Sequence, residues 1–349
     1  MISYMTSKQP YIRYKIEFQA ARLVSLESPL RVESTILPPI GPHNVRIEVH
    51  CAGINFYELM IMDGYYPVRP TLPTTLGGEL AGKVLETGSK VTAFRKGDRV
   101  FSLAQTSKGI TGSYAEQAQV DEKYLYHLPK GISFETGASI PMVTFAAHTM
   151  LRQRVTVPHN GIILIYNAAG GVGSALVQLA KALYPNITII GTCSSEKKVK
   201  AIYSLGADLV IDTSKKSLAG QLRKKFPDGI DIIFDSMGQR YLDVNLSLLR
   251  PLHGTMCSYG THTGPIVDPG LVAKLREKNV TLSGFLMWPL IENKKMCSNS
   301  FAEIFKILKT KKIIPVIDKI FPLKDINQAI RRIRQRKNIG KVLISTYRS

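Results

Sequence analysis

Cysteine, tryptophan and long apolar runs are scarce in this chain of 349 residues. The four cysteines form no CxxC pair, so the sequence indicates neither a disulfide framework nor a zinc knuckle. The longest apolar runs, near residues 162–166 and 175–183, are well short of the roughly 18 residues that a membrane span requires. We therefore expect no spanning helix and no secretory leader, and we expect a reducing cytoplasm as the compartment.

Acidic residues are also few: 26 Asp and Glu stand against 46 Lys and Arg, a formal net charge of +20. Such a surface attracts anions, including phosphate esters, nucleic acid and acidic lipid. Part of the charge lies in RRIRQRK (331–337), and we interpret these arginines as the solvated face of a helix, because they lie mostly off its apolar stripe. No aromatic residues are interleaved with them, which disfavours nucleic acid as a partner. Association with a membrane surface stays a minor alternative.

The order of sequence patterns divides the chain into an extension and two domains. Residues 1–14 show no helical or strand period, and they lack the Arg and Ser richness of a transit peptide, so we interpret them as an N-terminal extension. Residues 15–138 hold short β-rich runs punctuated by Gly and Pro, which predict an irregular β barrel. Residues 288–349 supply two amphipathic helices and a last strand, and we expect them to pack back on the barrel.

Residues 139–287 alternate between strand and helix patterns. Helical periods near residues 174–184, 196–206, 216–225, 239–249 and 271–278 separate the strands. Parallel neighbours need such crossovers and bury both faces, so the pattern predicts an α/β domain with a doubly wound parallel sheet. The six predicted strands are GIILIY (161–166), ITIIGT (187–192), DLVID (208–212), IDIIFD (230–235), GTMCSYG (254–260) and TLSGFLM (281–287).

A glycine-rich turn, NAAGGVG (167–173), joins the first of these strands to the following helix. Small residues let the backbone approach a pyrophosphate, Gly173 allows close packing of helix on strand, and the helix N-terminus offers free N–H groups. Ala168 occupies the first position of the usual G-x-G-x-x-G pattern, and a tight turn in some other α/β protein is the alternative. We predict a dinucleotide site at Ala168, Gly170, Gly171, Val172 and Gly173.

The end of the second strand favours NADP(H) over NAD(H). An NAD site presents an acid there for the ribose hydroxyls, yet no acid occurs between Gly173 and Glu196. Hydroxyl groups and a cation suit a 2′-phosphate, so we assign Ser194, Ser195 and Lys197 to it. The alternative is that the lysines of this segment are a solvated helix face, which we favour for Lys198 and Lys200.

With this domain following a β-rich one, the chain resembles the medium-chain dehydrogenase/reductase superfamily from about Tyr14 to Leu343. The resemblance is carried by AGINFYELMIMDGYYP, LGGELAGKV, GDRV, GSYAEQ, NAAGGVG, DSMG and GKVLI. It implies a GroES-like barrel domain (15–138 and 288–349) and a Rossmann cofactor domain (139–287). Zinc members of the superfamily carry a Cys near Asn55 and a His where Gly78 stands, and they have a four-cysteine lobe that is absent here. The resemblance is therefore to the zinc-free quinone oxidoreductases, with no metal ligands.

That branch implies roles for single residues. Asn55 and Tyr66 match its polar active-site positions, where a hydrogen-bond donor stabilises a developing oxyanion, although Tyr66 merely lining an apolar wall is an equal alternative. Ser236 and Gly260 lie in loops that border the nicotinamide ribose in the family. Arg336 matches an arginine that reaches the 2′-phosphate, whereas Thr213 stands where some relatives have a tyrosine.

The predicted function is transfer of hydride from NADPH to a quinone or an α,β-unsaturated carbonyl compound, without zinc. The resemblance also implies a homodimer, paired through the strand near residues 281–287. One alternative is a catalytically weak NADPH-binding protein with a membrane-adjacent or regulatory role, similar to the vesicle-amine-transport-protein-1 homologues. A zinc-independent alcohol or sugar dehydrogenase is the third hypothesis, and it is weaker because no His or Lys stands out as proton acceptor.

Overall fold

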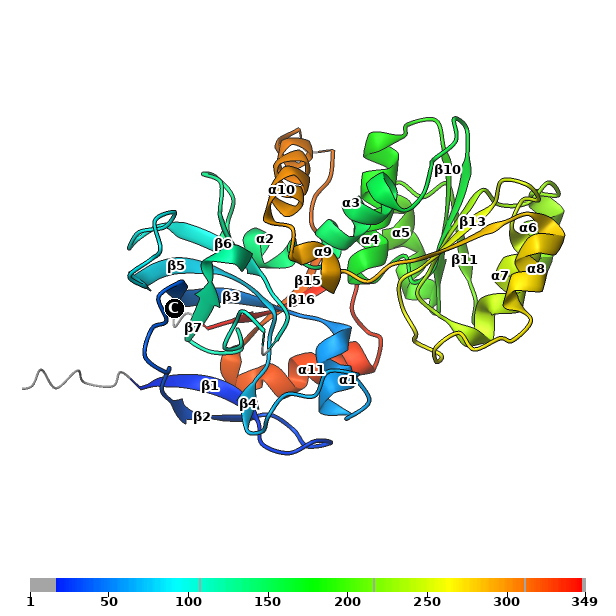
Figure 1. The fold of residues 1–349 in the computed structure, drawn as a ribbon. Helices are drawn as coiled ribbons and strands as arrows, with labels where there is room; N and C mark the ends of the chain where they lie inside the picture. The colour runs from blue at the N-terminus through cyan, green and yellow to red at the C-terminus, as the bar shows by residue number, and fades with distance from the viewer. Residues whose placement is uncertain (1–16, 107, 216, 311, 347–349) are drawn as a thin grey trace, which may run out of the picture.

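A computed structural model describes residues 17–106, 108–215, 217–310 and 312–346 of the chain. The N-terminal extension predicted for residues 1–14 lies outside them. Two β-sheets lie side by side, each with its own helices (Figure 1). No helix among the described residues has both the length and the apolar character needed to cross a bilayer.

The first large sheet has seven strands and is built from both ends of the described chain. Its order is β15-β16-β3-β5-β6-β8, with β7 paired to β3, and a smaller sheet has the order β2-β1-β4. β3 alternates buried and half-buried residues and then becomes fully buried toward Ile54, where the site begins. The strands of these two sheets together are β1 (Phe18–Leu23), β2 (Arg31–Thr35), β3 (Asn44–Ile54), β4 (Thr74–Thr75), β5 (Glu79–Thr87), β6 (Arg99–Leu103), β7 (Gln117–Asp121), β8 (Leu125–His127), β15 (Ile317–Pro322) and β16 (Lys341–Ser345).

The second sheet confirms the predicted doubly wound architecture. Its six strands are parallel and run in the order β11-β10-β9-β12-β13-β14. Ile163 and Ile165 of β9 belong to one apolar cluster and Leu164 to another, because the sheet is covered on both faces. The strands are β9 (Ile162–Ile165), β10 (Thr188–Cys193), β11 (Leu209–Asp212), β12 (Ile232–Asp235), β13 (Thr255–Ser258) and β14 (Thr281–Gly284). The helices around them are α4 (Gly171–Leu183), α5 (Val199–Ser204), α6 (Leu218–Lys225), α7 (Leu242–Leu248) and α8 (Leu271–Lys278).

The C-terminal tail returns to the first sheet. β16 pairs antiparallel with β3, so that Val342 lies opposite Ile54. This register brings Lys341 next to the start of α1, although the two segments are almost the whole chain apart. The remaining helices are α1 (Phe56–Met62), α2 (Phe134–Ser139), α3 (Val143–Gln153), α9 (Trp288–Ile291), α10 (Lys294–Lys309) and α11 (Ile326–Arg334), and four short 3-10 turns complete the described elements.

Candidate active site

One cavity of about 740 Å³ touches both domains. Its walls come from α1, β16 and the tail on one side and from the carboxyl ends of β9, β10, β12 and β13 on the other. Ligands of open α/β sheets bind at that edge, where the strand order reverses around β9. The cavity therefore lies where the glycine turn and the tail meet.

The glycine turn has the geometry of a phosphate cradle. α4 begins at Gly171, and no side chain caps its N-terminus, so the first N–H groups of the helix face the cavity. A Cβ on Gly173 would stand 2.2 Å from the carbonyl oxygen of Asn167, so only glycine fits at this position. A Cβ on Gly171 would stand 2.9 Å from the side chain of Val143. The backbone N–H of Gly340 donates to the Ala169 carbonyl at 2.7 Å and thereby ties the tail to the turn.

A cluster of cations lies beyond the turn. Lys198 and Arg336 line the cavity, and Asp63, the acid in its wall, is already paired with Arg334 (2.6 Å). The pKa of Lys198 is lowered, first by burial and also by the nearby Arg336 and Arg332 guanidinium groups. An anion placed among these groups would relieve both effects, so this end of the cavity suits a phosphate ester.

The predicted cofactor residues divide into two sets. Ser194, Ser236 and Gly260 line the cavity together with Arg336 and four members of the turn, Gly170, Gly171, Val172 and Gly173. Ala168 is fully buried behind the turn. Ser195 and Lys197 do not line the cavity, because residues Glu196–Lys198 form a 3-10 turn that leaves Lys197 exposed and directs Lys198 inward.

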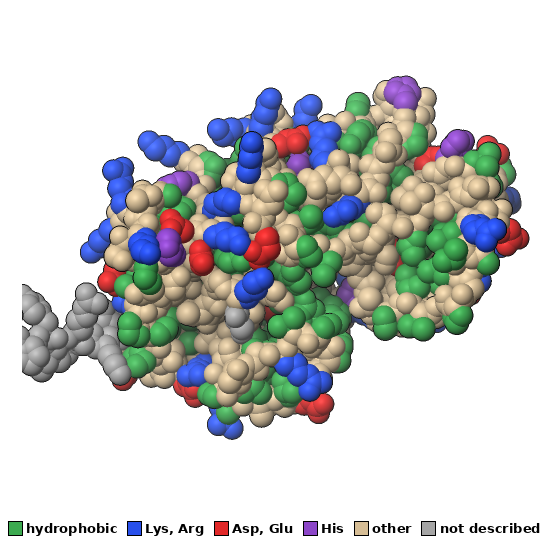
Figure 2. Space-filling model, viewed as in Figure 1, with side chains coloured by type: hydrophobic (Ala, Val, Ile, Leu, Met, Phe, Trp, Pro, Cys, Tyr) green, Lys and Arg blue, Asp and Glu red, His purple; other side chains and the backbone are tan. Residues whose placement is uncertain are grey.

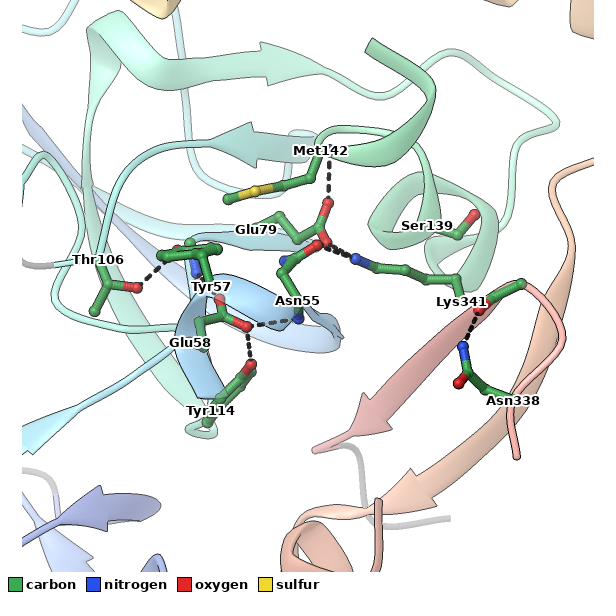
Figure 3. A network of polar contacts seen from close by, with 12 residues as sticks. Asn55, Tyr57, Glu58, Glu79, Thr106, Tyr114, Ser139, Met142, Asn338 and Lys341 are labelled. Atoms are coloured by element: carbon green, nitrogen blue, oxygen red, sulfur yellow. Dashed lines mark hydrogen bonds and ion pairs between the residues drawn. The ribbon is translucent and has the colours of Figure 1, made fainter. Parts of the chain in front are cut away.

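Asn55, the first predicted catalytic residue, belongs to a buried polar network (Figure 3). Its side-chain Nδ2 donates to Glu79 Oε1 at 2.9 Å, and its Oδ1 accepts from the Lys341 ammonium group, which also pairs with Glu79. Glu79 accepts a further bond from the backbone N–H of Met142 at 2.8 Å. Asn55 and Lys341 both line the cavity, so the network forms its floor.

A second carboxylate, that of Glu58, is buried behind Asn55 on the side away from the cavity. It accepts hydrogen bonds from the backbone N–H of Asn55 (2.7 Å), the backbone N–H of Gly78 (3.1 Å) and the hydroxyl of Tyr114. Burial nevertheless raises the pKa of Glu58 to about 7. Its contacts fix the start of α1, so Glu58 positions Asn55 and does not itself face the cavity.

Aromatic side chains surround the other end of the cavity. The indole N–H of Trp288 donates to the hydroxyl of Tyr66 at 2.5 Å, and the ring of Tyr57 lies 5.0 Å from the Trp288 ring and 5.6 Å from the Tyr66 ring. Because Tyr66 accepts this bond, its own hydroxyl hydrogen is free to be donated into the cavity. Phe56 packs on His262 at 4.3 Å at the edge of the cavity, and both rings line it.

The side chains near Asn55 do not fit a catalytic zinc ion. A Cβ on Gly78 would stand 2.3 Å from the carbonyl oxygen of Ala104 and 2.4 Å from the Tyr57 hydroxyl, so a ligating histidine has no room there. Burial raises the pKa of Cys51 to about 12, which keeps its thiol protonated. Over the described ranges, no group of three or more His, Cys, Asp or Glu side chains could hold a metal ion.

Two family models match the chain, one over the barrel strands and one over the second half of the six-stranded sheet and the tail. The alcohol dehydrogenase GroES-like domain matches residues 41–130, and the zinc-binding dehydrogenase family matches residues 205–344. Fold, cavity and family matches together define a two-domain dehydrogenase/reductase.

Relatives and solved structures narrow this class. Quinone oxidoreductase-like protein 2 of Bos taurus is 31% identical over 94% of this chain and 92% of its own length. The human synaptic vesicle membrane protein VAT-1 homolog is 29% identical over 88% of this chain and 80% of its own. The Escherichia coli quinone oxidoreductase complexed with NADPH superposes with a TM-score of 0.85 at 25% identity, over 94% of this chain and 99% of that one. The chain therefore belongs to the medium-chain dehydrogenase/reductase superfamily, in the branch of quinone oxidoreductase-like proteins and VAT-1 homologs.

Sequence reasoning missed four residues of the site. Lys198 was assigned to a solvated face, and Glu79, Lys341 and Trp288 were given no role. Glu79 and Lys341 lie in LGGELAGKV and GKVLI, two segments that carried the family resemblance. A charged residue inside an otherwise apolar strand was the available signal, because a buried charge needs a partner.

Proposed function

We propose that this protein is an NADPH-dependent reductase that transfers hydride to an uncharged quinone or α,β-unsaturated carbonyl compound without zinc. The observation that carries the proposal is one continuous cavity with a phosphate cradle at one end and aromatic rings with hydrogen-bond donors at the other. Beside the cradle lie two cations, Lys198 and Arg336, that have no carboxylate partner among the described lining residues. The solved structures similar to this chain include a quinone oxidoreductase complexed with NADPH, which supports the choice of cofactor.

The residues of the cavity fit a dinucleotide phosphate in three places. The N–H groups of Gly171 and Val172 at the start of α4 would hold the pyrophosphate. Lys198 and Arg336 would hold the 2′-phosphate, beside the Ser194 that follows β10 in place of the acid typical of NAD sites. When bound, NADPH supplies the hydride.

At the acceptor end, the chain's own side chains orient the substrate and meet the charge that develops on its oxygen. Tyr66, held by Trp288, offers a hydroxyl hydrogen to that oxygen. Asn55, held by Glu79 and Lys341, places an amide at the floor of the cavity. The aromatic walls stack on flat conjugated acceptors and exclude water, which strengthens both interactions.

The cofactor assignment is tested by measuring the dissociation constants of NADPH and NADH for two single variants. Lys198→Ala is expected to weaken NADPH binding about tenfold or more, because it removes a charge-assisted hydrogen bond to the 2′-phosphate. NADH binding should stay nearly unchanged, since NADH lacks this phosphate. Lys197→Ala is the matched variant, since Lys197 is the neighbouring exposed lysine that the sequence favoured. If only Lys197→Ala weakens NADPH binding selectively, Lys197 and not Lys198 contacts the 2′-phosphate. If Lys198→Ala weakens the binding of NADPH and NADH equally, Lys198 does not recognise the phosphate.

The activity itself is tested by following NADPH oxidation with a panel of quinones and enones. We expect Asn55→Ala to lower turnover and to leave NADPH affinity nearly unchanged, because Asn55 lies at the acceptor end. Unchanged turnover in this variant contradicts its role. If the wild-type protein binds NADPH tightly and reduces no acceptor, the alternative of a catalytically weak NADPH-binding protein is favoured.

We also propose that the protein forms a homodimer through β14. This strand (Thr281–Gly284) is the edge of the six-stranded sheet, and an open edge offers unpaired backbone groups to a second copy. Sedimentation analysis gives the mass in solution, and a proline placed at Ser283 is expected to shift a dimer to monomer. A monomeric wild-type protein contradicts the proposal.

A further inference from the structure

A second cavity, of about 860 Å³, lies on the barrel domain and shares no lining residue with the active-site cavity. One side is formed by α10, and the other by β6, β8 and the loop around Phe94. The α10 residues that line it recur at helical spacing from one end of the helix to the other, so the cavity is a groove that follows the helix: Lys294, Ser298, Phe301, Ala302, Phe305, Lys306 and Lys309. The sequence analysis assigned no role to this surface.

The floor of this groove, which we call the α10 groove, is apolar. Phe101, Tyr126, Phe301 and Phe305 pack on one another there, as in the 4.9 Å contact between Phe101 and Phe301, and Phe94 adds a ring that packs on His127. A cavity of this size and composition fits the range of sites that bind small molecules. Its elongated course along a helix suits a chain better than a compact ring system.

The rim of the α10 groove is basic. Lys123, Lys294, Lys306 and Lys309 line it against two acidic residues, Asp121 and Glu122. Lys123 is paired with Glu292, and the carboxylate of Glu122 is bonded to His43 at 3.0 Å, so the excess positive charge comes from the α10 lysines. Figure 2 shows lysine and arginine side chains gathered over the part of the surface where α10 lies. An apolar trough with a positive rim is complementary to a molecule with an apolar body and an anionic head.

Lys294 is the cation that is built into the wall. Its ammonium group lies 3.8 Å above the Tyr126 ring and donates to the backbone carbonyls of Glu122 (3.1 Å) and Leu125. It forms no ion pair with a carboxylate in the part of the chain that the structure describes. Burial lowers the pKa of Lys294 to about 8, so its charged form gains from an anion placed in the groove.

We propose that the α10 groove binds a long-chain fatty carboxylate, with the carboxylate at Lys294 and the alkyl chain along the aromatic floor. One chain, and not the two of a phospholipid, matches a single trough bounded by one helix. This site is independent of the proposed reductase activity, because no residue is shared with the active-site cavity.

The test is calorimetric titration of the full-length protein with oleate below its aggregation concentration. The wild-type protein is expected to bind one oleate per chain. Oleyl alcohol, which lacks the charge, is expected to bind at least about tenfold more weakly. Lys294→Met is expected to weaken oleate binding about tenfold or more. Lys295→Met is the matched control, since Lys295 is the adjacent exposed lysine of α10 and does not line the groove.

A second variant, which fills the groove, tests the proposal even if Lys294→Met fails to fold. Ala302 is exposed and lines the groove, so Ala302→Trp fills it without disturbing the core and should abolish binding while the thermal midpoint stays near that of wild type. Absence of oleate binding to the wild type, equal binding by Lys294→Met, or equal affinity for oleyl alcohol would overturn the proposal. Competition between oleate and a quinone in the presence of saturating NADPH would place the fatty chain in the active-site cavity and also overturn it.

Discussion

The buried pair between Lys341 and Glu79 offers the strongest quantitative test of the site. Lys341 is 3% exposed and Glu79 is not exposed at all. Two unit charges about 3 Å apart, in a medium of effective dielectric constant about 20, attract by about 5 kcal/mol. That attraction offsets the desolvation of both groups, so removing one partner leaves a buried charge whose desolvation is no longer compensated.

The four proteins of a double-mutant cycle should therefore differ strongly in stability. Glu79→Gln leaves the Lys341 ammonium without its carboxylate and is expected to lower the free energy of unfolding by about 3–5 kcal/mol. Lys341→Met should cost less, because Glu79 keeps its donors Asn55 Nδ2 (2.9 Å) and Met142 N (2.8 Å). The double variant should regain much of the loss, since no unpaired charge remains.

Chemical denaturation followed by circular dichroism supplies the four free energies. The exposed pair Lys215–Glu196, whose side chains are 57% and 75% exposed, is the control and should show a coupling energy below about 1 kcal/mol. If the losses from Glu79→Gln and Lys341→Met simply add to within about 0.5 kcal/mol, the two groups do not interact and the argument is refuted.

Three further predictions follow from the site. Gly173→Ala, whose Cβ would meet the Asn167 carbonyl at 2.2 Å, should destabilise the protein and abolish NADPH binding. Gly220→Ala in α6, whose Cβ would make only an ordinary contact with the Ser217 hydroxyl at 3.8 Å, should instead stabilise the protein by up to about 1 kcal/mol. Thermal midpoints that shift in the same direction in both variants contradict this. Because the pKa of Glu58 is raised to about 7, the folded chain holds this proton more tightly than the unfolded chain does. As the pH rises from about 4.5 to 7, the free energy of unfolding of the wild type should therefore fall by up to about 3 kcal/mol relative to that of Glu58→Gln. Unfolding free energies that change with pH in the same way in both proteins would refute it. Tyr66→Phe should lower kcat for enones with NADPH affinity unchanged, and an unaltered kcat would exclude the hydroxyl as donor.

The sequence predicted those features whose signal is local or periodic. Six apolar runs alternating with helical periods specify a parallel sheet, and the glycine spacing before α4 specifies a tight turn. α1 escaped prediction because its seven residues give too few turns for a period, and it follows a strand that is buried on both faces toward its end. The first of the two amphipathic helices predicted for the tail begins at Lys294, where the first seven residues, KKMCSNS, hold too few apolar side chains to show a helical period.

Contacts between distant segments were beyond sequence reasoning. Lys341 meets Asn55 across 286 positions of the chain, and only the antiparallel register of β16 with β3 creates that contact. The different orientations of Lys197 and Lys198 were beyond sequence reasoning for another reason. Their orientation depends on the phase of a 3-10 turn of three residues, and no pattern in so short a segment fixes that phase.

The charges of the active-site cavity, taken together, favour an uncharged acceptor. At the end near β10, Lys198 and Arg336 have no carboxylate partner among the cavity-lining residues that the structure describes, and a phosphate ester supplies the missing negative charge. At the other end, Lys341 is already neutralised by Glu79. An anionic acceptor would gain no counter-charge at that end and would still lose its hydration. A neutral conjugated carbonyl compound bears neither cost until hydride arrives, and only then does its oxygen need the hydrogen bond of Tyr66.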